Sequence, residues 1–410
     1  MRTLVLSDLH LGSAAVPGMF AGGEALPALL DHLGDAPLRV VLNGDTFDFT
    51  ALDEPFAGDP EACAEQLRLF ARGHAPVFAA LARVLARGGA LVLRCGEHDG
   101  ELALTGVQAG LREHFAAAGV APNLVVDGAP GARVLAVGGA RVAVVHDLVG
   151  GAREGAATRV LARRLLHPLR RQFGLDFVDL LRPDRVRAAL AALAVNPTAV
   201  KLVFADMPAV MVWRGLVEPG RADEAVGLAL AGAGLEPREH ALLLAALDPA
   251  AAIGCEPGDG PQLDLARRKL LRAALGGQAP RSEPHGPIGA DELAAARRLA
   301  RDHGVAAVLA GRTRAAGFLA EHDLCVVDTG AWVWRFTAPA ADDDAGWRGL
   351  LERWQRASGL AALRRDTPLW ARFTAGLIAP RAAGGARLEL IEWCDGAAVV
   401  HAGCDLPPAR

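Results

Sequence analysis

Short apolar runs alternate with segments of helical periodicity over about the first 150 residues. Most of these runs are too apolar to have a solvated face, which is typical of strands in a buried sheet. They lie at residues 3–7, 38–42, 90–94, 134–137 and 141–145. Between them, residues 22–33 and 60–87 have apolar positions spaced near the helical period of about 3.6. This alternation predicts an α/β fold.

From residue 150 to about 290 the pattern changes to helices rich in alanine, leucine and arginine. Prolines interrupt them repeatedly, at Pro183, Pro197, Pro208, Pro219 and Pro249. Residues 254–261 and 276–289 are rich in glycine and proline and are predicted to be loops. Strand-like runs return at 305–310, 324–327 and 332–336. The pattern therefore predicts a helical insertion that separates two parts of one α/β core.

The C-terminal part is predicted to be an extension. Three consecutive aspartates predict a surface connection at 338–346, before a helix at 347–365 and a hairpin that turns at Asp395 and Gly396. Six of the seven tryptophans lie at or beyond Trp332, which favours packing of this tail over a ligand cage. The predicted division is a core at 1–150 and 300–338, a mainly helical insertion at 151–299, and a C-terminal helix plus β-hairpin extension at 339–410.

Composition and charge exclude some classes of protein. With 410 residues, 52% hydrophobic and 22% charged, the chain has enough apolar residues for a sizeable core and is not wholly disordered. A net charge of −4 argues against a nucleic-acid-binding surface spread over the chain. The only lysines are Lys201 and Lys269, so nearly all of the 43 basic residues are arginine, which indicates codon bias in a GC-rich genome.

The sequence predicts a cytoplasmic protein. The apolar residues 1–6 are followed too soon by Asp8 and His10 to form a signal-peptide core. Charge-free stretches such as 188–200 fall short of the ~20 residues that span a bilayer. The cysteines, at positions 63, 95, 255, 325, 394 and 404, form no CxxC pair, which suits reduced thiols.

Aspartate and histidine follow four of the predicted strands. Asp8 and His10 come after the first, Asp45 after the second, His98 after the third, and His146 ends the fifth. Each separation along the chain leaves room for a strand-crossover unit, and loops at the carboxyl ends of buried strands usually carry ligands. One such residue would more often belong to an ordinary turn. Four strand ends that all carry Asp or His indicate a site for a divalent cation.

These segments resemble the calcineurin-like metallophosphoesterases, in particular the bacterial branch that includes the UDP-2,3-diacylglucosamine hydrolases. The resemblance covers roughly residues 1–150 and 300–336 and implies a sandwich of two packed β-sheets flanked by helices. It is carried by SDLHLGS (7–13), NGDTFDF (43–49), CGEHD (95–99), the strand-terminal His146, and AGRTR (310–314) followed by VDTGAW (327–332).

The resemblance implies a metal-dependent phosphoesterase that hydrolyses a phosphomonoester or phosphodiester of a small molecule, using one or two Mn²⁺ or Mg²⁺ ions. Asp8, His10 and Asp45 would hold one ion, and Asp45 would bridge to a second ion that His146 also binds. His98 would protonate the leaving oxygen. Glu97 replaces the asparagine of the family pattern, and its carboxylate is still a competent ligand.

The last motif departs from the family pattern more seriously. Arg312 and Arg314 stand where the family has two metal-binding histidines. A guanidinium has no lone pair for a metal, so each ion would lose a ligand and gain a cationic neighbour. Two hypotheses follow. Either reduced activity survives, or the chain is an inactive phospho-ligand-binding or scaffold protein in which the arginines neutralise the old metal carboxylates.

Three further features are less decisive. We expect Asp48 to support the site without binding metal, because it lies three residues beyond Asp45. His98 and Asp99 belong either to the active site or to local turn structure, with Asp99 as a helix cap. At 159–181 arginines alternate with leucines. That pattern favours an ordinary exposed helix, and weak contact with a membrane surface or a cover over an acyl-bearing substrate is the alternative.

Overall fold

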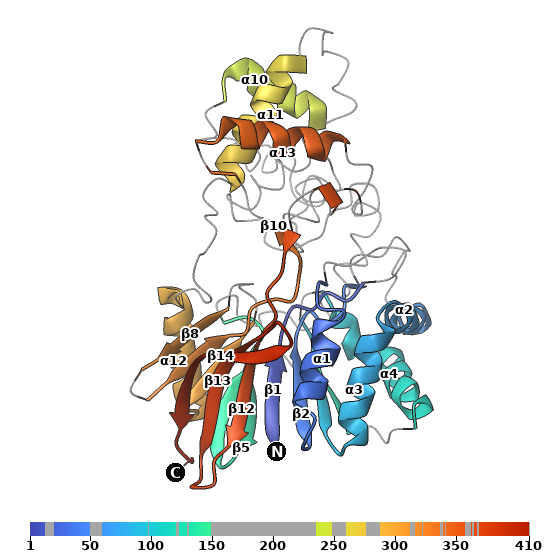
Figure 1. The fold of residues 1–410 in the computed structure, drawn as a ribbon, viewed down its shortest axis with the longest axis vertical. Helices are drawn as coiled ribbons and strands as arrows, with labels where there is room; N and C mark the ends of the chain where they lie inside the picture. Colours follow the sequence, from blue (N-terminus) through green and yellow to red (C-terminus); the bar gives the residue numbers. More distant parts are fainter. Residues whose placement is uncertain are drawn as a thin grey trace. The chain divides into compact units, whose positions relative to one another are not determined.

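The computed structural model separates the chain into two compact units, each described here by its own contacts (Figure 1). Unit 1 comprises Met1–Arg164, Arg281–Val333 and Ala371–Arg410, and unit 2 comprises Leu165–Pro280 and Trp334–Trp370. The residues that the structure describes are 1–12, 20–49, 60–96, 98–119, 123–128, 131–148, 235–247, 260–275, 288–311, 316–321, 323–336, 339–340, 342–356, 362, 365–366 and 369–409.

Unit 1 is α/β and contains two mixed sheets. The seven-stranded sheet has the order β14-β13-β12-β1-β2-β3-β4, in which β1 to β4 are parallel and β12 to β14 antiparallel. Its strands are β1 (Arg2–Leu6), β2 (Leu38–Asn43), β3 (Ala90–Arg94), β4 (Leu124–Asp127), β12 (Thr374–Pro380), β13 (Ala386–Cys394) and β14 (Ala397–Leu406). The five-stranded sheet has the order β5-β6-β7-β9-β8, with β5 (Arg133–Val137), β6 (Ala140–Val144), β7 (Ala307–Ala310), β8 (Gly317–Ala320) and β9 (Cys325–Asp328).

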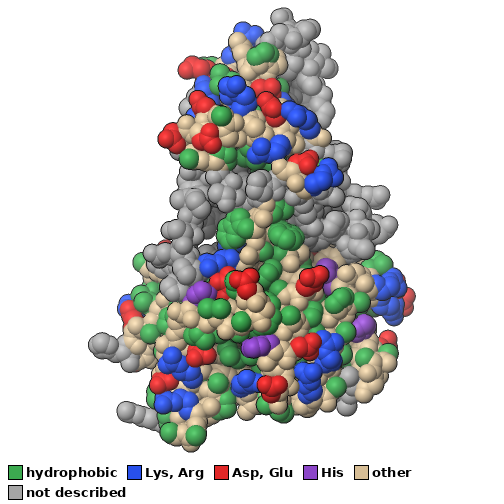
Figure 2. All heavy atoms as spheres, viewed as in Figure 1, with side chains coloured by type: hydrophobic (Ala, Val, Ile, Leu, Met, Phe, Trp, Pro, Cys, Tyr) green, Lys and Arg blue, Asp and Glu red, His purple; other side chains and the backbone are tan. Residues whose placement is uncertain are grey.

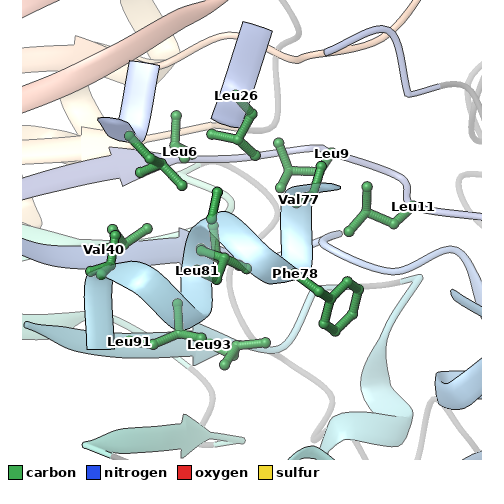
Figure 3. Close-up of a cluster of buried hydrophobic side chains, with 14 of the residues drawn as sticks. Leu6, Leu9, Leu11, Leu26, Val40, Val77, Phe78, Leu81, Leu91 and Leu93 are labelled. Carbon is green, nitrogen blue, oxygen red and sulfur yellow. The ribbon is translucent and has the colours of Figure 1, made fainter. Parts of the chain in front are cut away.

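Successive side chains of a strand point to opposite faces of its sheet, and in the seven-stranded sheet both faces are covered. In β1, Leu4 and Leu6 contact the helical layer, whereas Val5 belongs to the cluster that joins the two sheets. Figure 3 shows Leu6, Val40 and Leu91 of the sheet among side chains of the covering helices. These helices are α1 (Ala25–His32), α2 (Pro60–Gly73), α3 (Ala75–Ala86) and α4 (Thr105–Ala117).

A single described helix covers the five-stranded sheet. Ala296 of α12 (Ala290–His303) packs in a cluster with Val308 and Val326, on the face of that sheet turned away from the first sheet. Figure 1 places α12 on one side of unit 1 and α1, α3 and α4 on the other. Unit 1 is therefore layered as helices, sheet, sheet and helix, in agreement with the predicted two-sheet architecture.

Most predicted strands of the core are confirmed within about two residues, and so is the C-terminal hairpin, whose strands β13 and β14 flank Asp395 and Gly396. The predicted helix at 60–87 is two helices that meet at His74, because Pro76 occupies the first turn of α3. The predicted helix at 347–365 is shorter, since α13 is Asp344–Arg356. The predicted strand at 332–336 is reduced to β10 (Arg335–Phe336).

The division of the chain differs from the predicted one at two boundaries. Residues 371–410 are part of unit 1 because β12 pairs antiparallel with β1, through Thr3 and Ile378 among others. Helix α12 also belongs to unit 1, although most of it falls in the predicted insertion at 151–299. Residues 159–181, where a membrane-surface contact was considered, lie outside the described residues.

Unit 2 has a helical core that includes part of the C-terminal region. It contains α10 (Pro237–Leu247), α11 (Gly260–Leu275), α13 and the short strands β10 and β11 (Leu369–Trp370). Trp347 and Trp354 of α13 are fully buried, and the Trp347 indole N–H donates to the Ala340 carbonyl at 2.8 Å. Lys269 of α11 pairs with Glu239 of α10 at 2.8 Å. These contacts favour packing over a ligand cage for the two α13 tryptophans.

The described surface is of mixed charge. On the face of unit 1 in Figure 2, acidic and basic side chains are interspersed. No single described helix is long and apolar enough to cross a membrane, and only the bent pair of α2 and α3 meets the length and composition requirements together.

Candidate metal centre

The loops that follow β1 and β2 run side by side at the carboxyl ends of these parallel strands. The His10 N–H donates to the Asp45 carbonyl at 2.9 Å, and the Leu11 N–H donates to the Thr46 carbonyl at 2.9 Å. The Asp8 N–H donates to the Gly44 carbonyl at 3.2 Å. These backbone hydrogen bonds keep Asp8, His10 and Asp45 at the same edge of the sheet.

Three of these residues have an unusual backbone conformation. Asp8, His10 and Asp45 have φ values of 53°, 48° and 50°. In the described chain Asp395, in the exposed hairpin turn, is the one other non-glycine residue with positive φ. Left-handed backbone is sterically unfavourable for residues with a Cβ and often occurs at functional sites. The strain here directs three potential ligands into one small buried volume.

The first group of potential metal ligands consists of Asp8, Asp45 and His146, all buried, with donor atoms within 4.8 Å of one another. His146 follows β6, so the five-stranded sheet contributes one ligand and the seven-stranded sheet two. No described residue hydrogen-bonds the buried Asp8 Oδ2. Two carboxylates and one imidazole are suitable ligands for a divalent ion such as Mn²⁺.

The orientation of the His146 ring is compatible with either a proton or a metal ion between His146 and Asp45. His146 Nδ1 lies 2.8 Å from the Asn43 carbonyl, which can only accept a hydrogen bond, so Nδ1 carries the proton. Nε2 faces Asp45 Oδ2 at 3.2 Å, and it presents a lone pair to this oxygen when the ring is neutral. Two acceptors at that distance repel each other unless a proton or a metal ion lies between them. A carbonyl that orients a histidine in this way is typical of metal sites.

The pKa values of the two aspartates shift in opposite directions. Burial raises the pKa of Asp8, and the neighbouring charge of Asp45 adds to this, against the opposing influence of His10 and His146. Burial would also raise the pKa of Asp45, but His146, His98 and His10 outweigh it and hold that pKa well below its usual range. A bound cation would favour the ionised form of both carboxyls.

A second group consists of His10, Asp48 and His98, which are also buried and have donor atoms within 4.8 Å of one another. His98 Nδ1 lies 3.2 Å from Asp48 Oδ1, and the rings of His10 and His98 meet edge to face with centroids 4.7 Å apart. His10 is also next to the first group, with Nε2 3.6 Å from Asp8 Oδ1. The two groups are therefore neighbours.

Asp99 has a role that differs from the helix cap considered above. Its side chain makes no capping hydrogen bond to the short 3-10 helix Gly100–Ala103 that follows it. Instead Asp99 Oδ2 accepts from the Thr46 N–H at 2.7 Å, and Oδ1 accepts from the Gly96 N–H at 2.6 Å. Burial and the charge of Asp45 raise the pKa of Asp99 to about 6. Asp99 thus joins the loops after β2 and β3.

A buried polar network between the sheets was not foreseen from the sequence. Arg94, at the end of β3, is only 4% exposed and donates to Asn43 Oδ1 at 3.3 Å and to the Val144 carbonyl at 2.5 Å. Asn43 Nδ2 donates in turn to the Val145 carbonyl at 2.8 Å. The network connects the strands that precede Asp45 and His146. Its signal in the sequence was an arginine ending an otherwise apolar strand.

The structure places most, but not all, of the predicted site residues. Asp8, Asp45 and His146 come together in one group, whereas His10 belongs with His98 and Asp48. His98 is fully buried, and its backbone N–H donates to Asp45 Oδ1 at 2.9 Å. Three predicted positions, Glu97, Arg312 and Arg314, lie outside the described residues.

Replacing Gly44 by alanine is expected to weaken metal binding at least about tenfold. Changes to the residues around a metal ligand typically weaken binding by about this much or more. Gly44 has φ 84°, and a Cβ there would lie 2.5 Å from Cγ and Nδ1 of the His146 ring. Gly88→Ala is the matched control, because Gly88 has φ 76° and nothing within 4 Å of its Cβ position. Both variants lose about 1–2 kcal/mol of folding stability through the backbone. Calorimetric titration with Mn²⁺ contradicts this prediction if the two variants bind equally well.

Comparison with known proteins adds no assignment. No family model matches the chain. No curated protein matches it either.

Proposed function

We propose that this protein is a metal-dependent phosphoesterase that hydrolyses a phosphomonoester or phosphodiester of a small molecule. The observation that carries the proposal is the group of Asp8, Asp45 and His146, in which His146 Nε2 faces Asp45 Oδ2 at 3.2 Å inside a buried cluster. Mn²⁺ or Mg²⁺ fits a site with two carboxylates, and the imidazole favours Mn²⁺ of the two.

A divalent ion held by this group would polarise a phosphoryl oxygen and lower the pKa of a bound water. The other residues then have distinct tasks. Asp48 accepts a hydrogen bond from His98 Nδ1 and orients the ring, so that His98 can donate a proton to the leaving oxygen. Asp99 holds the loops that contain Asp45 and His98 in register through the Thr46 and Gly96 N–H groups.

The alternative function is an inactive phospho-ligand-binding or scaffold protein. The observation in its favour is the pair of arginines at 312 and 314, which have no lone pair for a metal. It predicts that the purified protein binds no Mn²⁺ and that changing both Arg312→His and Arg314→His creates binding. The phosphoesterase proposal predicts that the unmodified chain already binds.

Removing and restoring metal tests the proposal directly. After treatment with a chelator, Mn²⁺ at about 100 times its Kd is expected to stabilise the protein by about 2.7 kcal/mol, because it binds only the folded state. For a unit of this size that raises Tm by roughly 5–10 °C. Mn²⁺ is also expected to restore hydrolysis of p-nitrophenyl phosphate or bis(p-nitrophenyl) phosphate. Absence of both bound Mn²⁺ and turnover at millimolar Mn²⁺ would leave the scaffold alternative.

A further inference from the structure

We infer that His10, Asp48 and His98 form a second, separate cation site that takes a borderline ion such as Zn²⁺, and that occupancy of this site inhibits the hydrolase. The inhibitory part rests on the proposed function, whereas the binding part does not. The inference starts from the three buried side chains, whose donor atoms lie within 4.8 Å of one another.

The spacing of the donor atoms suits a small ion. Zn²⁺ binds imidazole nitrogen and carboxylate oxygen at about 2.0–2.2 Å, so two ligands at a tetrahedral angle are about 3.4 Å apart. His98 Nδ1 and Asp48 Oδ1 are 3.2 Å apart, close to that separation. The His10 ring meets the His98 ring edge to face with centroids 4.7 Å apart, which brings the third ligand to the same place.

The two groups have different chemistry and should select different ions. Asp8, Asp45 and His146 supply two carboxylates and one imidazole, whereas His10, Asp48 and His98 supply two imidazoles and one carboxylate. More nitrogen and less negative charge favour Zn²⁺ over Mg²⁺ or Mn²⁺. Three protein ligands also leave a coordination position open for water.

Occupancy of the second site conflicts with the task of His98. His98 Nδ1 and Asp48 Oδ1 are within hydrogen-bond distance, and the ring supplies the proton between them when Asp48 is ionised. An ion bound by the same two atoms would displace that proton and hold the ring as a ligand. His98 could then no longer be oriented by Asp48 as the acid. We therefore expect Zn²⁺ to reduce Mn²⁺-supported hydrolysis of p-nitrophenyl phosphate at least tenfold.

The test measures binding separately from activity. Metal-free full-length protein is titrated with Zn²⁺ by calorimetry and with Co²⁺ by visible absorption, for the unmodified chain, Asp48→Asn, Asp8→Asn and the control Asp31→Asn. Asp31 pairs with Arg83 on the exposed surface of α1 and α3 and contacts neither group. We expect Asp48→Asn to weaken one Zn²⁺ site at least about tenfold, and Asp8→Asn to leave that site intact. His10→Asn, in which asparagine tolerates the left-handed backbone, should reproduce the effect of Asp48→Asn.

The outcomes separate the two ideas. If Asp48→Asn and His10→Asn bind Zn²⁺ with the stoichiometry and affinity of the unmodified chain, and both retain its circular dichroism spectrum, the second site does not exist. If the second site binds Zn²⁺ but the unmodified protein shows no Mn²⁺-dependent turnover, the site stands and the proposed phosphoesterase fails. If Zn²⁺ fills the site and hydrolysis is unchanged, the inhibitory role is wrong.

Discussion

Replacing Asp45 by asparagine is expected to abolish detectable Mn²⁺ binding at the group of Asp8, Asp45 and His146 and to lower hydrolysis of p-nitrophenyl phosphate at least about 100-fold. Asp45 is the carboxylate that His146, His98 and His10 all stabilise electrostatically, and their combined effect keeps its pKa low despite complete burial. Asparagine has nearly the same shape but no charge. With asparagine at position 45, Asp8 would be the one carboxylate left in this group to bind the ion.

The substitution separates charge from structure. Asparagine is among the residues that best tolerate the left-handed backbone at this position, φ 50°, and its oxygen can still accept from the His98 N–H. The matched control is Asp395→Asn, because Asp395 has φ 51° but lies exposed in the turn between β13 and β14. Metal-dependent Tm and turnover should be unchanged in the control. Retention of Mn²⁺ binding by Asp45→Asn would mean that the metal centre has been placed wrongly.

Replacing Arg94 by alanine is expected to destabilise the protein by about 3–5 kcal/mol, as removal of one partner from a buried charged network does. Arg94 NH1 donates to Asn43 Oδ1 and the Val144 carbonyl, NH2 donates to the Gly131 carbonyl, and Nε lies 3.5 Å from Asp127 Oδ2. Alanine removes this donor from the buried Asn43 side chain and the buried Val144 carbonyl. Urea unfolding of the metal-free protein measures the loss.

Arg133→Ala is the control for this experiment, because Arg133 contacts the same carboxylate, Asp127 Oδ2, at 3.2 Å from a side chain that is 32% exposed. A partly exposed ion pair contributes about 0–1 kcal/mol, so the control should lose far less stability than Arg94→Ala. Arg94→Lys should fall between the two, since lysine keeps the charge but not the planar fork of donors. Equal losses for Arg94→Ala and Arg133→Ala would show that the network between the sheets contributes little.

The Arg94 network also explains why His146 can reach Asp45. Asn43 accepts from Arg94 through its side chain, donates to the Val145 carbonyl, and accepts from His146 Nδ1 through its own carbonyl. These contacts connect the end of β2 in one sheet with the end of β6 in the other. The geometry of the candidate metal group, which is built from both sheets, therefore depends on buried polar residues outside that group.

The sequence predicted the elements whose patterns are local. Strand β3 was predicted at its observed limits, Ala90–Arg94, because all five positions are buried and the first four are apolar. Strand β12 was missed because its sequence, TAGLIAP, contains Gly376 and ends in proline, both unfavourable in a strand. Its pairing with β1 outweighs these local preferences.

At the candidate site, too, contacts between distant residues could not be predicted from the sequence. Aspartates and histidines at strand ends could be recognised from residue type and spacing, but their distribution between two groups could not. Asp48 was expected only to support the site, yet it lies within ligand distance of His98 and His10. Asp99 was considered as a cap, yet it bonds to Thr46 in a distant loop. Neither contact can be predicted from the residues next to Asp48 or Asp99 in the sequence.

The sequence by itself determined the alternation of buried strands and helices and the types of side chain at their carboxyl ends, because periodicity and turn chemistry act between near neighbours. Only the tertiary structure decided which side chains share a site. That decision depends on contacts between residues far apart in the chain, such as Asn43 with Val145 and Thr329 with Ser7. Such contacts form when two sheets pack face to face, and their partners are set by register and burial.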